Sequence, residues 1–180
     1  MIERSIVVVA LSIAVGLPTT APHASAQQPR PPTCTSEEHR QFDFWVGSWD
    51  VFDPDGRQVG TNEIRRQLNG CALHESWESL AGPHRGHSYN IYDRSTGRWH
   101  QTWVDNSGLL LQLDGGIEEG RMVLEGRTRN ADGDEVLNRI TWSPLDDTAS
   151  GDEAVRQLWQ TSEDGGETWS VVFDGRYVKR

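Results

Sequence analysis

Residues 85–104 read Arg-Gly-His-Ser-Tyr-Asn-Ile-Tyr-Asp-Arg-Ser-Thr-Gly-Arg-Trp-His-Gln-Thr-Trp-Val, two segments of strand length with a turn sequence between them. Successive side chains of a strand point to opposite faces, so alternate residues share a face. In both segments one face combines aromatic with polar side chains: Ser88, Asn90 and Tyr92 in the first, Trp99, Gln101 and Trp103 in the second. The turn residues Ser95-Thr96-Gly97 between them predict an antiparallel hairpin.

The same pattern extends in both directions from this hairpin. Turn sequences such as Asp53-Pro54-Asp55-Gly56 and Asp114-Gly115-Gly116 recur at short intervals. They divide the chain into ten segments of strand length: 43–52, 57–68, 71–80, 85–93, 98–104, 109–113, 121–129, 135–143, 154–162 and 168–178. Short turns favour antiparallel pairing, because parallel strands need longer crossover connections. We therefore predict an all-β, antiparallel up-and-down barrel of about ten strands, which leaves no exposed edge. A β-sandwich is the alternative.

The N-terminal part of the chain has a different character. Glu3 and Arg4 precede an apolar run over 6–17, and the small residues Ala24-Ser25-Ala26 follow. This pattern is typical of a secretory signal peptide, so we expect residues 1–26 to be removed and the protein to be exported to the periplasm or beyond. Residues 27–34 form a Pro-rich linker, and 35–180 form the barrel domain. The capping-box sequence Thr35-Ser36-Glu37-Glu38 predicts a short helix that ends near Gln41.

Composition excludes several classes of function. The formal net charge of −10 leaves no basic surface for nucleic acid. Beyond the N-terminus no apolar run is long enough to span a bilayer. The chain also lacks the nucleophile elbow, the His-Glu-x-x-His motif and the phosphate loop, so the common hydrolase, metalloprotease and nucleotide-binding signatures are missing.

The two cysteines, Cys34 and Cys71, form an even pair. In an oxidising compartment such a pair favours a disulfide over a metal site, which needs more ligands. The bond would tie the linker end to the barrel. Two free buried thiols are the alternative.

A cavity is the interpretation that we favour for the mixed aromatic and polar face. Aromatic walls bury a ligand, and a few polar groups orient it. The walls are assigned to Trp77, Tyr92 and Trp103, and the orienting groups to Glu75, Ser88, Asn90 and Gln101. We expect a small, partly apolar ligand and no cofactor. In the alternatives this face points to water, or the interior is completely filled.

Glu75 stands out because its alternation with Leu73 and Trp77 places a carboxyl group inside the barrel. Burial would raise its pKa, or a cation such as Arg139 would pair with it. Such a group could orient a ligand, form a structural ion pair, or act as the general acid or base of an enzyme.

Several stretches are similar to a known family. They are Gly47-Ser48-Trp49 within 42–51, Asn69-Gly70-Cys71 with the segment up to Trp77, 88–93, 97–105, Met122-Val123-Leu124-Glu125-Gly126 and Phe173-Asp174-Gly175-Arg176-Tyr177. Together they resemble the lipocalin-like bacterial domain-of-unknown-function family 1579 over most of the chain after Cys34. The resemblance implies a calycin-type barrel, often secreted, with no established reaction.

Two further resemblances concern smaller parts of the chain. Related nitrobindin-type barrels bind haem through a histidine near the C-terminus, but no histidine follows His100 here. A haem would need another ligand, such as His87 or His100. Separately, Ser162-x-Asp164-x-Gly166-x-Thr168-Trp169 resembles the Asp-box of sialidases, which implies a structural hairpin between the last two strands.

Overall fold

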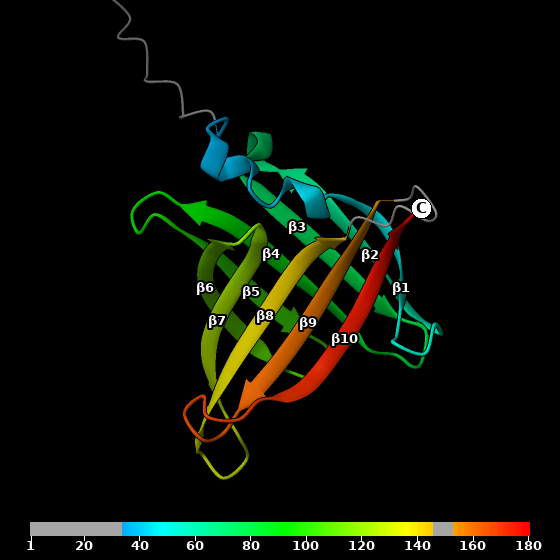
Figure 1. The fold of residues 1–180 in the computed structure, drawn as a ribbon, viewed down its shortest axis with the longest axis vertical. Helices are drawn as coiled ribbons and strands as arrows, with labels where there is room; N and C mark the ends of the chain where they lie inside the picture. The colour runs from blue at the N-terminus through cyan, green and yellow to red at the C-terminus, as the bar shows by residue number, and fades with distance from the viewer. Residues whose placement is uncertain (1–33, 146–152) are drawn as a thin grey trace, which may run out of the picture. The chain divides into compact units, whose positions relative to one another are not determined.

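The structure, a computed structural model, describes residues 34–145 and 153–180, all of which belong to one unit, Pro32–Arg180. The expected signal peptide, 1–26, and linker residues 27–33 lie outside the described residues. Within the described part, ten antiparallel strands form a closed barrel in which each strand pairs with its neighbours in sequence and β1 pairs with β10 (Figure 1). The up-and-down calycin-like barrel is therefore confirmed, and a sandwich is excluded.

The strands have the bounds that the turn sequences predict, with small shifts. They are β1 Gly47–Phe52, β2 Gln58–Gln67, β3 Ala72–Ser79, β4 Arg85–Asp93, β5 Arg98–Asp105, β6 Leu110–Glu118, β7 Arg121–Arg129, β8 Glu135–Leu145, β9 Ala154–Ser162 and β10 Ser170–Lys179. The largest difference is β6, which was predicted to end at Leu113. It continues through Gly115 and Gly116 because a Cβ at Gly115 would collide with the backbone of Val123, so this glycine permits close strand packing rather than a turn.

The predicted inward face is confirmed for three consecutive strands. In β3, Leu73, Glu75 and Trp77 are all buried. Ser88 and Asn90 of β4 are also buried, as are Trp99 and Gln101 of β5, whereas Trp103 is half-buried. The mixed aromatic and polar face therefore points into the barrel and not to water.

Arg139 corrects one part of the prediction. On β8 the buried side chains are Val136, Asn138, Ile140 and Trp142, so Arg139 points outward. It forms an ion pair with Glu125, at 2.5 Å, and its guanidinium lies 4.0 Å from the centre of the Trp169 ring. It is not the partner of Glu75. The alternation of β8 sends its apolar side chains inward and keeps the guanidinium in contact with solvent, which avoids a large desolvation cost.

The N-terminal helix is shorter than predicted and is a 3-10 helix. It comprises η1 (Glu37–Arg40), and a second turn, η2 (Asp43–Trp45), follows. A third short turn, η3 (Leu68–Gly70), connects β2 to β3. The N-cap of η1 is Ser36 and not Thr35, and the Ser36 hydroxyl contacts His39 Nδ1 at 2.8 Å instead of forming the capping box.

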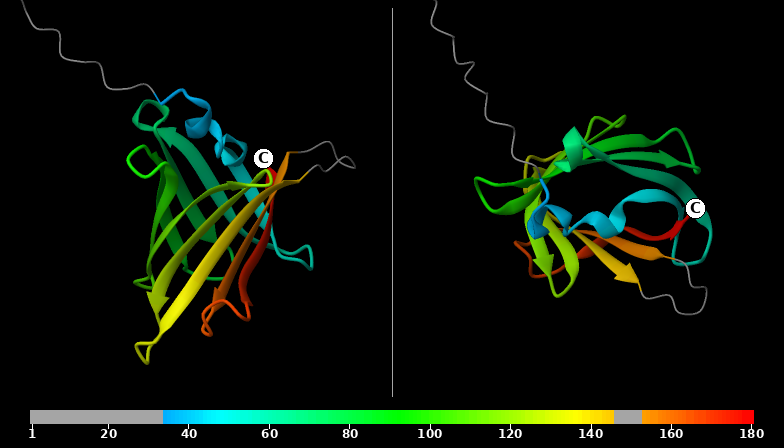
Figure 2. Two further views of the ribbon diagram at one scale, coloured as in Figure 1. Left: turned by 60° about the vertical axis from the view of Figure 1, so that its left-hand side comes forward. Right: turned by 90° about the horizontal axis from the view of Figure 1, so that it is seen from above.

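The segment that carries η1 and η2 crosses one end of the barrel (Figure 2). It inserts Phe42 and Trp45, which are fully buried, into that end. Phe42 stacks on Trp45 with ring centres 4.9 Å apart and packs edge-on against Trp99 and Trp142. These aromatic side chains pack together across this end of the barrel, which we call the closed end.

The predicted disulfide is present. Cys34 and Cys71 are bonded at 2.05 Å, and the described residues contain no free cysteine. The bond joins Cys34, which lies before the N-cap of η1, to Cys71, the residue immediately before β3. Arg40 reinforces this connection by donating hydrogen bonds to the carbonyl oxygens of Cys34 and Gly70. The segment that carries η1 and η2, which we call the closing segment, is therefore fixed covalently to the barrel wall.

The hairpin between β9 and β10 has the arrangement that the Asp-box resemblance predicts. Asp164 accepts hydrogen bonds from the backbone N–H and hydroxyl of Thr168 and from the hydroxyl of Ser162. The Trp169 indole donates to the carbonyl oxygen of Gly166. The interactions are local, so this motif shapes a turn and has no reactive group of its own.

Candidate ligand-binding cavity

A cavity of about 570 Å³ occupies the end of the barrel opposite the closed end, into which Phe42 and Trp45 insert. Its lining comes from the β1–β2 and β3–β4 connections, from the adjoining strand ends and from the first half of β10. The central lining residues are Glu75, Trp77, Gln101, Trp103, Leu111, Ile140, Gln157, Trp159, Phe173 and Tyr177. Its volume lies within the range of small-molecule sites. A completely filled interior is thereby excluded.

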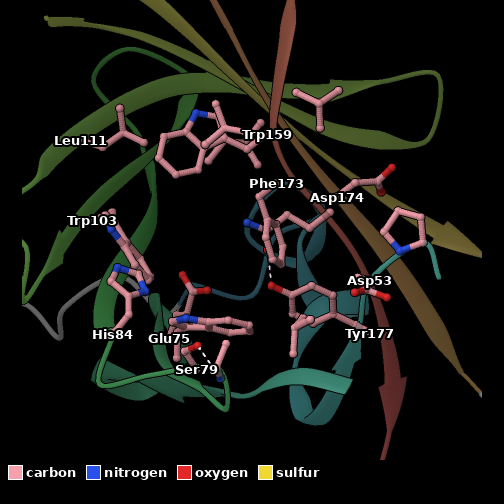
Figure 3. A pocket seen from close by; sticks show the side chains of 18 of the residues that line it. Asp53, Glu75, Ser79, His84, Trp103, Leu111, Trp159, Phe173, Asp174 and Tyr177 are labelled. Carbon is pink, nitrogen blue, oxygen red and sulfur yellow. Dashed lines mark hydrogen bonds between the residues drawn. The ribbon is translucent and has the colours of Figure 1, made fainter. Parts of the chain in front are cut away.

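Five aromatic side chains contribute to the wall: Trp77, Trp103, Trp159, Phe173 and Tyr177. Figure 3 shows the Glu75 carboxylate among Trp103, Trp159 and Phe173. Trp77 packs edge-on against Phe173 with ring centres 5.7 Å apart. Three indoles and a phenyl ring therefore line the same cavity as the Glu75 carboxyl group.

Three of these rings lie against glycines. A Cβ at Gly60 would overlap the Trp77 ring, one at Gly86 would overlap the Trp103 ring, and one at Gly175 would overlap the Phe173 ring. The φ angles of these glycines do not require glycine, so space alone accounts for the residue type. The glycines allow the rings to lie flat along the wall and so leave the centre of the barrel open.

Hydrogen bonds fix the orientation of two indoles. Trp103 Nε1 donates to Asp105 Oδ2 at 3.1 Å, and Trp159 Nε1 donates to Asn138 Oδ1 at 3.0 Å. Burial opposes ionisation of Asp105, but hydrogen bonds from Ser107, Trp103 and His84 together lower its pKa to about 2. Asp105 is therefore an ionised acceptor for the Trp103 indole across the neutral range.

Glu75 is the only carboxyl group among the buried residues in the described part of the chain, at 3% exposure. Its Oε1 accepts a hydrogen bond of 2.7 Å from Asn62, and its Oε2 accepts one of 2.6 Å from Ser88. Burial raises the pKa of Glu75 to about 7, although these two hydrogen bonds partly oppose the rise. The group thus changes its charge near neutral pH.

Glu75 belongs to a polar belt with members on β5, β4, β3, β2, β10 and β9, and the belt crosses the interior face of β1 between β2 and β10. Gln101 donates to Asn90 at 2.9 Å, Asn90 donates to Ser88 at 2.8 Å, and Ser88 donates to Glu75. On the other side of Glu75, Asn62 contacts Tyr177 at 3.4 Å, and the Tyr177 hydroxyl donates to Gln157. Each member holds its neighbour, which restricts the rotamers of the whole set.

The structure places the predicted site residues in three groups. Glu75, Trp77, Gln101 and Trp103 line the cavity. Ser88 and Asn90 are buried beside them in the belt but are not part of the lining. Tyr92 lies toward the closed end. Its ring centre is 5.2 Å from that of His39 and 6.3 Å from that of Trp99. It is therefore not brought to the cavity.

Several residues at the cavity are not among the predicted site residues. Gln157, Trp159, Phe173 and Tyr177 line it, Asn62 donates a hydrogen bond to Glu75 beside it, and Gly60, Gly86 and Gly175 lie behind three of its rings. The alternation of β9 does place Gln157 and Trp159 together on one mixed aromatic and polar face. A signal was present in Phe173-Asp174-Gly175-Arg176-Tyr177, where two aromatic residues and a glycine share one face and two charged residues the other. Asn62 similarly shares its face with Gly60 and Ile64.

The charged side chains around the opening are already paired. His84 Nε2 lies 3.3 Å from Asp105 Oδ2. Asp53 forms an ion pair with Arg57 and Asp174 forms one with Arg156, with N···O distances of 2.6 Å and 2.7 Å. No lysine or arginine lines the cavity in the described part of the chain. Glu75 therefore has no counter-charge.

The described residues offer no group of three or more His, Cys, Asp or Glu side chains that could hold a metal ion. His87 stacks on His74 on the outer surface, with ring centres 5.4 Å apart, and His100 contacts Asp114 at 2.9 Å. Neither faces the cavity, so neither could ligate a haem bound inside it. No helix within 34–145 or 153–180 is both long and apolar enough to traverse a bilayer.

Comparison with known proteins adds no assignment. The sequence matches no family model, and no curated protein matches it significantly.

Proposed function

We propose that this protein binds a small, partly apolar molecule inside its barrel. The observation that carries the proposal is the open cavity of about 570 Å³, walled by oriented aromatic rings and containing one uncompensated carboxyl group. A packed structural barrel would place side chains there, and three glycines instead keep the rings against the wall. Apolar walls would bury the ligand, and Glu75 and Gln101 would orient it.

Replacing Trp103 with alanine tests the proposal. Trp103 is half-buried at the cavity wall, so its removal should weaken binding without unfolding the protein. Native mass spectrometry of the purified protein would identify the bound molecule, and thermal shift would then compare wild type with Trp103→Ala. A ligand-induced shift that is the same in both proteins would contradict binding in this cavity.

A second candidate function is acid or base catalysis by Glu75. The pKa of about 7 is the specific observation that favours it, because such a group can both donate and accept a proton near neutral pH. Glu75→Gln would then keep binding and abolish turnover. The hydrogen bonds from Asn62 and Ser88 to both carboxylate oxygens favour an orienting role, and binding is therefore our first proposal.

We further propose that the protein is exported and belongs to the lipocalin-like family that its sequence resembles. The signal-peptide pattern and the disulfide support export, because disulfides persist in oxidising compartments. The ten-stranded closed barrel supports the family assignment. Cell fractionation of the full-length chain, with sequencing of the mature N-terminus, tests export. An uncleaved protein in the cytoplasm would contradict it.

A further inference from the structure

We propose that the natural ligand is a protonated primary amine with an apolar body. The ammonium group would bind the Glu75 carboxylate, and the body would lie between the indoles. This inference rests on the proposed function of the cavity and specifies the chemical class of its ligand.

The first argument is charge. Glu75 is buried at 3% exposure, and its two hydrogen-bond donors, Asn62 and Ser88, are neutral. No lysine or arginine of the described residues lines the cavity. A buried carboxylate normally has a cationic partner or becomes neutral, because desolvation of an unpaired charge is costly. A ligand ammonium would supply the positive charge that the lining of the cavity does not offer to Glu75.

The second argument is hydrogen bonding. Each oxygen of Glu75 accepts one hydrogen bond and can accept another. Beside it, Asn62 Oδ1 is buried and has no donor within the described part of the chain. A primary ammonium carries three N–H donors and no acceptor, so it matches this excess of acceptors. An anionic ligand would meet the carboxylate instead, and a quaternary ammonium could donate nothing.

The third argument is the aromatic wall. Trp77, Trp103 and Trp159 all line the space beside Glu75, as Figure 3 shows for Trp103 and Trp159. An indole face attracts a cation more strongly than any other side-chain ring does, and the attraction grows when the cation is desolvated. The net charge of −10 would also increase the rate at which a cation encounters the protein.

The charge of Glu75 should couple binding to pH. The other titratable groups at the cavity are Tyr177 on β10, whose pKa burial and the nearby Glu75 raise further, and the paired groups His84, Asp53 and Asp174 at the opening. Glu75 is half-protonated near pH 7, so binding of an ammonium should release a proton from it. A His84→Asn variant tests whether the imidazole at the opening contributes to the proton release.

Three probes with one ring system test the proposal: 1-naphthylmethylamine, 1-naphthylmethanol and 1-naphthylacetate. Isothermal titration calorimetry at pH 8 on the full mature protein should show the amine binding at least about tenfold more tightly than the alcohol, with the acetate weakest. Lowering the pH to 5.5 should remove most of the amine's advantage, because Glu75 is then protonated. These measurements use only the wild-type protein, so their outcome does not depend on whether a variant folds.

Variants assign the effect to Glu75. Glu75→Gln should lose the preference for the amine over the alcohol, because a neutral amide offers the ammonium no opposite charge. Glu78→Gln removes the same charge from the same strand at an exposed position and should change neither affinity. Titration in buffers of different ionisation enthalpy at pH 7 should show release of about half a proton for wild type and His84→Asn, and none for Glu75→Gln.

The outcomes separate the two proposals. Equal binding of amine and alcohol, both weakened by Trp103→Ala, would overturn the amine specificity and leave the cavity as a binding site. A preference for the amine that persists in Glu75→Gln would also overturn it. If no probe binds wild type, or Trp103→Ala weakens none of them, both the amine specificity and the proposed function fail.

Discussion

Ser88 Oγ donates a 2.6 Å hydrogen bond to Glu75 Oε2 from the position directly opposite it on the neighbouring strand, and both side chains are almost completely buried. A hydroxyl group can serve either charge state, because it donates to a carboxylate and can rotate to accept from a carboxylic acid. The pair therefore permits Glu75 to titrate inside the barrel without loss of its contact.

The first prediction concerns stability and pH. The pKa of Glu75 is raised from its ordinary value of 4.5 to about 7 in the folded protein, so the folded state binds this proton more tightly than the unfolded state. The resulting stabilisation is complete below pH 4.5 and is lost as the pH rises through 7. Between these limits wild type should lose about 3 kcal/mol relative to Glu75→Gln. Urea unfolding of both proteins at pH 4.5, 6 and 8 measures this difference, and parallel pH profiles would contradict it.

The second prediction concerns the glycine beneath Trp103. Gly86→Ala places a methyl group where the Trp103 ring lies, so the indole should be displaced into the cavity. We expect the affinity for 1-naphthylmethanol to fall about tenfold and stability to fall by about 1–3 kcal/mol through overpacking. Gly116→Ala is the matched control, because a Cβ there meets open space within a strand. Equal affinities of the two variants would show that Gly86 does not position the indole.

The third prediction concerns the disulfide. Replacing Cys34 and Cys71 together with serine opens a loop of sequence separation 37. In the chain-entropy model the free energy of unfolding should fall by about 4 kcal/mol. Chemical denaturation compares the variant with oxidised wild type, and wild type under reducing conditions should match the variant. A difference below about 1 kcal/mol would mean that Arg40 and the aromatic contacts hold the closing segment by themselves.

The fourth prediction separates the two ends of the barrel. Phe42 is fully buried between Trp45, Trp99 and Trp142 at the closed end, so Phe42→Ala should cost about 3–5 kcal/mol of stability. Ligand affinity should remain unchanged while the protein is folded, because none of these rings lines the cavity. A parallel loss of affinity would show that the closed end also shapes the binding site.

Part of the candidate site could be predicted from local alternation. On β3 to β5 the inward residues are those that the two-residue period selects, because hydrogen-bonded neighbours with short turns keep one face in register. The same reasoning correctly found Glu75 as the buried carboxyl group. It placed Tyr92 in the cavity because alternation identifies a face and carries no information on height along the barrel.

Arg139 shows a second limit. The alternation on β8 does not say which of its two sets of side chains faces inward. Only the burial of Ile140 and Trp142 in the structure shows that their set does and that the set with Arg139 faces outward. The cation that local reasoning would pair with Glu75 therefore lies on the outer surface, and the missing counter-charge becomes visible only in three dimensions.

The amino-acid sequence by itself determined the short spacing of about ten strands and their antiparallel order, and it favoured the disulfide and the inward face of β3 to β5, because each depends on nearby residues or on a single pair. Only the tertiary structure decided that β1 and β10 close the sheet, that Asn62 and Tyr177 meet at Glu75, and that glycines hold the rings against the wall. The β1–β10 pairing and the Asn62–Tyr177 contact join strands far apart in the chain, so they depend on barrel closure. The glycine contacts are local, but they depend on the height at which each ring enters the interior.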